Sequence, residues 1–432
     1  MLYLSFSKLE LWFAALPALL LLMHIREGLF WLLSGFFFFF FSLRCASISA
    51  VEFGGLSPLL FYPLFSALAL LLGLYQFYAP LVLWKTFLGR LPLALPVAFV
   101  LFELLRSHFP YGGFPWLVMG ALSVYLPVVK DSLLYLNVYW QSLFLLWSVQ
   151  LLLYRKLEWL AGLWSVLIFL GLFALWEKGK RLEKAERVKV SLVQTAVPQE
   201  DKLHREAFRN HAPHILSLVE QAVGLGVDLV VLPESALHFF YSDEEDPHNV
   251  RLRELSLKTP ILVGLVDLRE GVRPYNSAYL LKGGVEVAHY DKVKLFPVGE
   301  YLPWPFGFLK RLIPAVGGVD YVRGERLEPL AYGKMSIATP ICFEVAYHSL
   351  VKKLSERANL LVVLTNDGWF RDSDCTHQHY LWARVRALEN GKYLLWVNNS
   401  GDTGVIDLYG RVLSKMPYMK RGVSLHEVPL LP

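Results

Sequence analysis

The chain has 432 residues, of which 55% are hydrophobic and 15% aromatic, and its formal net charge is +5. This composition is too apolar for one ordinary soluble domain. The charge is modest and no basic stripe with interleaved aromatic residues is present, so we expect no nucleic-acid partner. The three cysteines, Cys45, Cys342 and Cys375, are too few and too widely spaced to indicate a disulfide framework.

Most apolar residues precede residue 177, where six stretches approach the length that a bilayer requires. A run of phenylalanines in the second stretch, Phe36–Phe41, is more typical of a lipid-facing surface than of an aromatic ligand box. We therefore predict an α-helical membrane bundle of about six helices over residues 1–177. The stretches cover residues 9–23, 29–43, 59–78, 91–105, 133–154 and 157–176.

Charges in the short loops predict the orientation of this bundle. Arg26, then Lys85 with Arg90, then Arg155 with Lys156 fall in alternate loops. The positive-inside tendency makes those loops cytoplasmic and, with six crossings, places the large C-terminal domain on the outer side. The charged connector at 178–187 points the opposite way, but residues that flank a long domain weigh little.

A loop between the fourth and fifth stretches combines charge, glycine and aromatic residues. Glu103 and Arg106 lie at the end of an apolar helix, which Gly113-Phe-Pro-Trp116 terminates. The two charges favour a mutual pair near the interface, and Trp116 suits a headgroup-level anchor. An equally weighted alternative is a lipid entry path, because charge within a membrane often marks function.

From about Val188 the pattern changes to short apolar strands that alternate with helices. Such alternation predicts an α/β layered domain over residues 188–432. The expected strands cover residues 188–193, 228–232, 260–267, 276–281, 335–341, 360–365 and 392–397, and the expected helices 205–223, 345–357 and 377–390.

Three reactive side chains follow expected strands: Glu234, Lys292 and Cys342. Strand ends of an open α/β sheet converge on one edge. There a glutamate can take a thiol proton, and a lysine can stabilise a thiolate and a developing oxyanion. Because Cys342 precedes an expected helix, we also expect a lowered thiol pKa. Taken singly, an inert cysteine or a solvated charge is the commoner case.

Cys375, His377 and His379 form a second cluster of reactive residues. It could bind a metal or supply a rival Cys–His nucleophile. Zinc sites need four ligands at characteristic spacings, and no second cluster is evident. We therefore expect a role at a helix start or in a loop, and we predict no metal and no cofactor.

Several motifs resemble the nitrilase, or carbon–nitrogen hydrolase, superfamily. They are Pro233-Glu-Ser235, Tyr290-x-Lys292, Cys342-Phe-Glu344 and Thr365-Asn-Asp-Gly-Trp-Phe370. Longer motifs resemble one branch of it, the bacterial apolipoprotein N-acyltransferase family, over nearly the whole chain. These are Val193-Gln-Thr-Ala-Val-Pro-Gln199, Phe296-Pro-Val-Gly-Glu-Tyr-Leu-Pro303, Asn366-Asp-Gly-Trp-Phe370, Asn398-Asn-Ser-Gly401, Glu103-x-x-Arg106 and Gly113-Phe-Pro-Trp116.

The resemblance implies an αββα sandwich and assigns the site. It makes Glu234 the base, Lys292 the oxyanion stabiliser and Cys342 the nucleophile. The supporting carboxylates are Glu300 and Glu344, and the residues expected to bind substrate are Asn276, Trp369 and Trp116. The chain departs from the family at Phe343, where a tyrosine is usual, and at Leu203, where a tryptophan is usual. From the resemblance we also expect counterparts of the first and last family helices to be absent.

The implied activity is transfer of an acyl chain from a phospholipid, through a Cys342 thioester, to the N-terminal amine of a diacylglyceryl-cysteine in a lipoprotein. The implied location is the bacterial cytoplasmic (inner) membrane, crossed several times, with the catalytic domain on the periplasmic side. Segments Tyr301–Arg323 and Trp369–Thr376 are expected to cover the thioester. The alternatives are a membrane-tethered amidase or nitrilase and a non-catalytic nitrilase-like binding protein.

Overall fold

The computed structural model describes residues 1–269, 273–302, 304 and 320–432. These residues form two compact units. The first comprises Met1–Glu177 and Asp372–Val385, and the second comprises Lys178–Arg371 and Arg386–Pro432. Most of the first segment that was expected to cover the thioester, at 303 and 305–319, lies outside the described residues.

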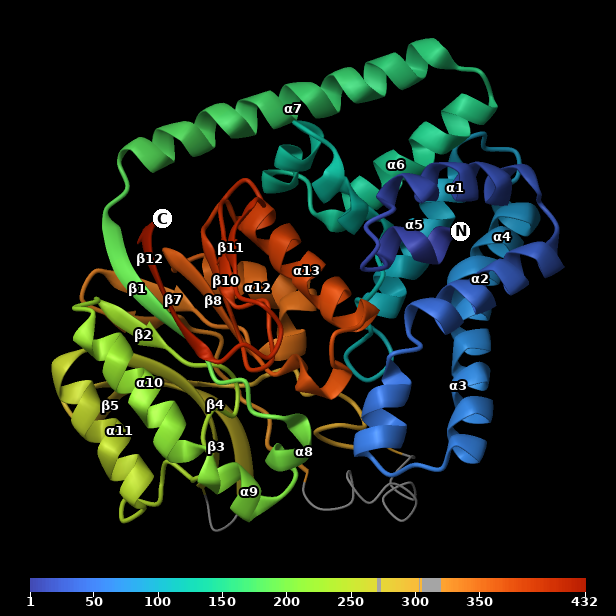
Figure 1. Ribbon diagram of the computed structural model, residues 1–432. Coiled ribbons are helices and arrows are strands. Elements are labelled where there is room, and N and C mark those ends of the chain that lie inside the picture. The colour runs from blue at the N-terminus through green and yellow to red at the C-terminus, as the bar shows by residue number, and fades with distance from the viewer. Residues whose placement is uncertain (270–272, 303, 305–319) are drawn as a thin grey trace. The chain divides into compact units, whose positions relative to one another are not determined.

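Helices build the first unit, because long apolar stretches satisfy their backbone groups most readily within a helix. Each of the six predicted stretches contains one (Figure 1). They are α1 (Ala15–His24), α2 (Gly28–Ser42), α3 (Pro58–Gly73) with α4 (Ala79–Leu83), α5 (Ala94–His108), α6 (Val138–Leu153) and α7 (Leu157–Glu183), and the unit also holds most of α13 (Asp374–Asn390).

Within the described residues, two helices are long and apolar enough to cross a membrane. One is Pro58–Leu88, of 31 residues, in which π-helical turns join α3 to α4 and extend it. The other is Leu157–Glu183, of 27 residues. Trp12–His24, Gly28–Ser42 and Val138–Leu153 are shorter apolar helices. Six crossings therefore remain a proposal.

Glu103 and Arg106 are both buried and do not form the predicted mutual pair among the described residues. Arg106 instead donates hydrogen bonds to the carbonyl oxygens of Phe114 and Trp116, at 2.9 and 2.6 Å. A Glu103 carboxylate oxygen accepts the Met119 N–H at 2.9 Å. Burial favours this arrangement, because each charge reaches backbone groups that would otherwise lack partners. The two side chains thus position the loop that carries Trp116.

Cys45 and Cys375 form a disulfide between residues 330 positions apart, which the sequence analysis did not predict. Cys375 is therefore neither a nucleophile nor a metal ligand, and no group of three potential ligands occurs among the described residues. Two further contacts hold the same segment: the Gln378 side-chain amide donates to the Ser42 carbonyl, and Gln378 Oε1 accepts from Trp116 Nε1 at 2.7 Å. Residues 372–385 thus pack as part of the first unit.

The second unit contains two six-stranded sheets. The order is β12-β1-β2-β3-β4-β5 in one sheet and β11-β10-β9-β8-β7-β6 in the other. The first sheet consists of β1 (Arg187–Gln194), β2 (Leu229–Val231), β3 (Ile261–Arg269), β4 (Arg273–Lys282), β5 (Val285–Asp291) and β12 (Gly422–Pro429). The second consists of β6 (Leu330–Tyr332), β7 (Met335–Ala338), β8 (Leu360–Thr365), β9 (Leu394–Asn398), β10 (Gly404–Ile406) and β11 (Val412–Lys415).

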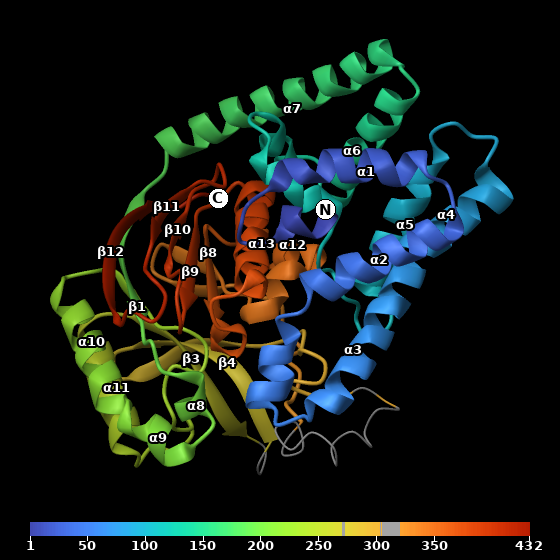
Figure 2. The ribbon, with the colours of Figure 1, turned by 45° about the vertical axis from the view of Figure 1, so that its right-hand side comes forward.

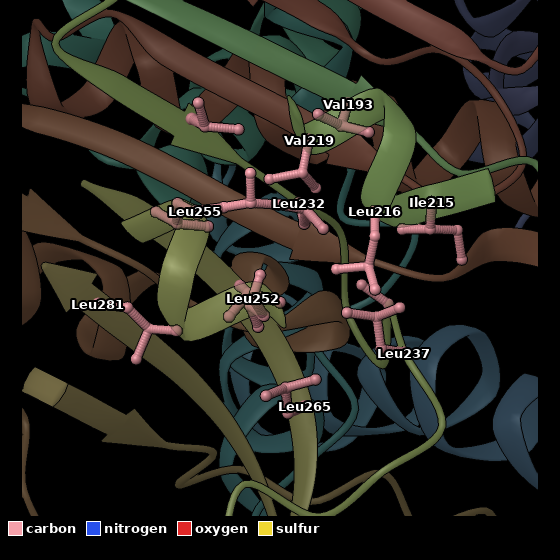
Figure 3. Packing of buried hydrophobic residues seen from close by; sticks show 14 of the residues in the cluster. Val193, Ile215, Leu216, Val219, Leu232, Leu237, Leu252, Leu255, Leu265 and Leu281 are labelled. Carbon is pink, nitrogen blue, oxygen red and sulfur yellow. The ribbon is translucent and has the colours of Figure 1, made fainter. Parts of the chain in front are cut away.

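Helices cover the outer faces of the two sheets, while the inner faces pack together at β1 and β9 (Figure 2). On the first sheet lie α10 (Ala212–Gly224) and α11 (Pro247–Lys258), and their apolar faces form a buried cluster with β1–β4 (Figure 3). On the second, α12 (His348–Ser355) packs against β7. This is the predicted αββα sandwich. The helix expected at 205–223 is divided into α9 (Arg205–Asn210) and α10, because Pro213 favours the first turn of a new helix.

Candidate active site

Glu234 lies on the turn that follows β2. The Gly264 N–H donates to the Pro233 carbonyl at 3.2 Å, and the Ala236 N–H donates to the Gly264 carbonyl at 2.8 Å. A Cβ atom at position 264 would lie 2.6 Å from the Glu234 Cα atom. Only glycine therefore allows β3 to approach this turn so closely.

Lys292 directly follows β5, and its buried ammonium contacts two carboxylates. Its Nζ atom lies 2.9 Å from Glu300 Oε1 and 3.4 Å from Glu234 Oε1. The Asn276 side-chain amide donates to the same two oxygens, at 2.8 Å to Glu234 and 2.9 Å to Glu300. Asn276, which was expected to bind substrate, thus holds the two carboxylates around Lys292. Burial alone would lower the pKa of Lys292, but Glu300 and Glu234 raise it well above its ordinary value.

Glu344 takes a different place from Glu300. It has no hydrogen bond or ion pair with Lys292 within the described part of the chain. Its carboxylate accepts the backbone N–H groups of Val293, Lys294 and Ile341, at 2.7–2.8 Å, and the Tyr290 hydroxyl at 3.0 Å. Glu344 thereby joins the segment after β5 to the turn that carries Cys342. Burial raises its pKa to about 7.

Cys342 is the first residue of the short 3-10 helix Cys342–Ala346, and its φ of 53° is unusual for a residue other than glycine. Such a strained turn between a strand and a helix exposes a nucleophile at a sheet edge. The residue keeps some accessible surface. Glu234 and Lys292 both act electrostatically on its thiol.

The expected lowering of the Cys342 pKa is wrong. Burial of the thiol, followed by the charge of Glu234, raises its pKa well above its ordinary value, and Lys292 opposes this only in part. A helix of five residues also offers little dipole to offset the loss of solvent. The Cys342 thiol is therefore protonated at rest and would need a base in order to act as a nucleophile.

The other two predicted substrate residues lie on other elements. Trp369 is half-buried in the 3-10 helix Asp367–Phe370, which directly follows β8 and Asn366. Trp116 belongs to the first unit, where it is buried. Tyr290 and Asp367 belong to the family motifs, but the sequence predicts no role for either of them. Tyr290 binds Glu344, and the charge of Asp367 contributes to the raised Cys342 pKa.

Comparisons with known proteins identify the family of this domain. Residues 189–431 match the carbon–nitrogen hydrolase family. Among solved structures, an amidase from Nesterenkonia sp. aligns at a TM-score of 0.41 and 21% identity, over 56% of this chain and 90% of that chain. Nit3 of Saccharomyces cerevisiae, from the nitrilase superfamily, aligns at 0.42 and 18%, over 57% and 91%. The fold and the family match define the second unit as a carbon–nitrogen hydrolase domain.

Residues 1–151 match the apolipoprotein N-acyltransferase N-terminal domain. The chain is 41% identical to the apolipoprotein N-acyltransferase of Aquifex aeolicus (strain VF5), over 98% of this chain and 95% of that protein. It is 31% identical to the enzyme of the same name from Rhizobium rhizogenes, over 87% and 74%. The chain therefore belongs to the apolipoprotein N-acyltransferase family. This confirms the predicted family, the predicted fold and the expectation of an N-acyltransferase.

Proposed function

We propose that the chain transfers an acyl group from a membrane phospholipid to the N-terminal amine of a diacylglyceryl-cysteine in a bacterial lipoprotein, through a thioester on Cys342. The observation that carries this proposal is the Glu234–Lys292–Glu300 network, because the charges of Glu234 and Lys292 act on the Cys342 thiol. Family membership supports the choice of acceptor, since the related proteins are named apolipoprotein N-acyltransferase.

In the first half-reaction, Glu234 accepts the thiol proton as the Cys342 sulfur attacks the ester carbonyl. The Lys292 ammonium stabilises the oxyanion, and its two carboxylate neighbours keep it charged. When the tetrahedral intermediate collapses, the ester C–O bond breaks. Glu234 then gives its proton to the departing glycerol oxygen, which releases a lysophospholipid and leaves the thioester.

In the second half-reaction, the neutral amine attacks the thioester carbonyl and forms the amide bond as the C–S bond breaks. Glu234 accepts the amine proton and returns it to the sulfur. The base, the oxyanion stabiliser and the nucleophile thus serve both halves, and the enzyme ends in its starting protonation state.

We extend the membrane association that the family implies to a multi-pass protein of the bacterial cytoplasmic (inner) membrane, with the catalytic domain on the periplasmic side. The alternate-loop charges support this side. So does the Cys45–Cys375 disulfide, because such bonds persist mainly in oxidising compartments. The test is a Lys420→Cys variant treated with a membrane-impermeant thiol reagent. We expect labelling in cells whose cytoplasmic membrane is intact, and labelling only after that membrane is opened would contradict the topology.

Mass spectrometry of the protein incubated with phospholipid alone tests the chemistry. We expect one added acyl chain, mapped to Cys342, which a diacylglyceryl-cysteinyl peptide then removes as an amide product. Cys342→Ser is the control for non-specific acylation. A preparation that acylates the peptide but never carries an adduct on Cys342 would exclude the thioester route.

A further inference from the structure

Lys202 places a second ammonium near the site, and the mechanism above does not use it. It is the last residue of α8 (Gln199–Lys202). Although its stem is partly exposed, its Nζ atom is buried and has no hydrogen-bond partner among the described residues. The Nζ atom lies over the Phe208 ring, 5.1 Å from the ring centroid. Buried ammonium groups are normally paired, because loss of water is costly. A buried donor without an acceptor therefore indicates a ligand.

The position of Lys202 is well fixed. Asn366 donates to Gln199 Oε1 at 3.0 Å, which ties α8 to the turn after β8. The Asn399 side-chain amide donates to the Val197 carbonyl at 2.9 Å, which ties the preceding loop to the end of β9. A cation held on such a braced segment suits recognition of a defined group.

Electrostatics place this ammonium on the Glu234 side of the site. Within the described chain, Glu234 is the charged group that acts on Lys202, and it opposes the effect of burial, which lowers the Lys202 pKa to about 7. The Phe208 ring, which Lys202 contacts, also stacks on the His238 ring, with 5.3 Å between the ring centroids. Burial also lowers the pKa of His238, so this ring is neutral above pH 7.

The chemistry of the donor indicates what reaches this side. Glu234 must protonate the leaving glycerol oxygen, so the leaving group lies next to Glu234. In a glycerophospholipid, only a short chain of carbon atoms separates the ester oxygen from the phosphate. The phosphate therefore follows the leaving group towards Glu234, where it would meet the buried ammonium. A phosphodiester is a permanent anion and a strong hydrogen-bond acceptor.

We propose that Lys202 binds the phosphate of the phospholipid donor and so selects glycerophospholipids over uncharged glycerolipids. The inference rests on the proposed function and names a specificity residue for it. The ammonium would lie between the phosphate and the Glu234 carboxylate and would reduce the repulsion between them.

The test compares two donors with the same acyl chains, a phospholipid and a diacylglycerol, in the rate of Cys342 thioester formation. Both share the ester and the triad, so their ratio of kcat/KM isolates the phosphate. We expect the wild-type ratio to exceed ten at pH 6.5 and to fall by up to tenfold per pH unit above pH 7, as the unliganded ammonium loses its proton. Lys202→Met should bring the ratio close to one at pH 6.5 and above pH 7. Lys202→Arg should keep the ratio high over the same range, because arginine stays charged.

Lys353→Met, which removes an exposed lysine on α12, is the matched control and should retain the wild-type ratio. If Lys202→Met lowers both rates equally, Lys202 supports the fold or Glu234 and the phosphate site is excluded. An unchanged ratio in Lys202→Met also overturns the inference. If the wild-type protein forms no thioester with either donor, the proposed function itself fails, and this result is distinct from both others.

Discussion

Lys292 and Arg106 are both buried cations, but the groups that they contact differ. Lys292 contacts the carboxylates of Glu234 and Glu300, which lie 58 and 8 residues away. Arg106 donates mainly to neutral acceptors, the Gln76 side chain and the carbonyl oxygens of Phe114 and Trp116. Charged partners keep an ammonium protonated and reactive in a buried site. Neutral backbone partners hold a loop in place. The difference supports the proposed catalytic role of Lys292 and a structural role for Arg106.

The variant with the largest expected effect on the reaction removes the charge of Lys292. We expect Lys292→Met to slow thioester formation at Cys342 by a hundredfold or more, which corresponds to ~3 kcal/mol of lost oxyanion stabilisation. Intact-mass measurement after exposure to phospholipid follows the rate. Glu234→Gln should also block the reaction, because an amide cannot accept the thiol proton. Near-normal adduct formation in either variant would remove that residue from the triad.

Removal of the structural charge should lower stability rather than change the chemistry. Arg106→Ala leaves the Phe114 and Trp116 carbonyls without their donor, and we expect a loss of about 3 kcal/mol in the free energy of unfolding. Denaturation in detergent micelles measures it. Arg90→Ala, at an exposed arginine, is the matched control. If the two variants unfold alike, Arg106 does not hold the loop.

Reduction of the Cys45–Cys375 disulfide should weaken the first unit without touching the nucleophile. We expect a double Cys45→Ser, Cys375→Ser variant to lose about 2–4 kcal/mol of stability. Under denaturing, non-reducing conditions the wild-type protein should take up one alkyl group, at Cys342, and after reduction three. Three groups before reduction would show that the disulfide is absent from the isolated protein.

Glu344 gives the most specific effect, because its pKa of about 7 lies above that of an unfolded glutamate. Between pH 5 and 7 the folded state therefore binds the extra proton, and stability falls as the pH rises through this window, by at most ~1.4 kcal/mol per unit. Glu344→Gln should abolish that slope. Thermal unfolding of both proteins from pH 5 to 8 measures it, and identical slopes would refute the assignment.

The sequence predicts the parts of this site that depend on local pattern. Glu234 and Cys342 follow apolar runs that do form strands or adjoin them, so their place at strand ends is predictable. The roles of Lys292, Cys342 and Glu234 stay predictions until they are tested, as do the three-part division of the chain and the substrate roles of Trp369 and Trp116.

What sequence could not predict depends on burial and on distant pairing. The raised pKa of Cys342 follows from the loss of solvent around the thiol, which no motif encodes. The pairing of β12 with β1 joins the two ends of the second unit, and no local pattern specifies it. The pairing of Cys45 with Cys375 could not be predicted for the same reason, because only the folded chain brings the end of α2 and the start of α13 together.

The membership of residues 372–385 in the first unit has a consequence for biogenesis. The ribosome completes the six apolar stretches long before it reaches Asp372. The helical unit therefore lacks residues 372–385 until late in translation. A chain truncated before this point would leave α2 without its disulfide partner and Trp116 without Gln378. The first unit therefore cannot reach its final packing until residues 372–385 have been translated.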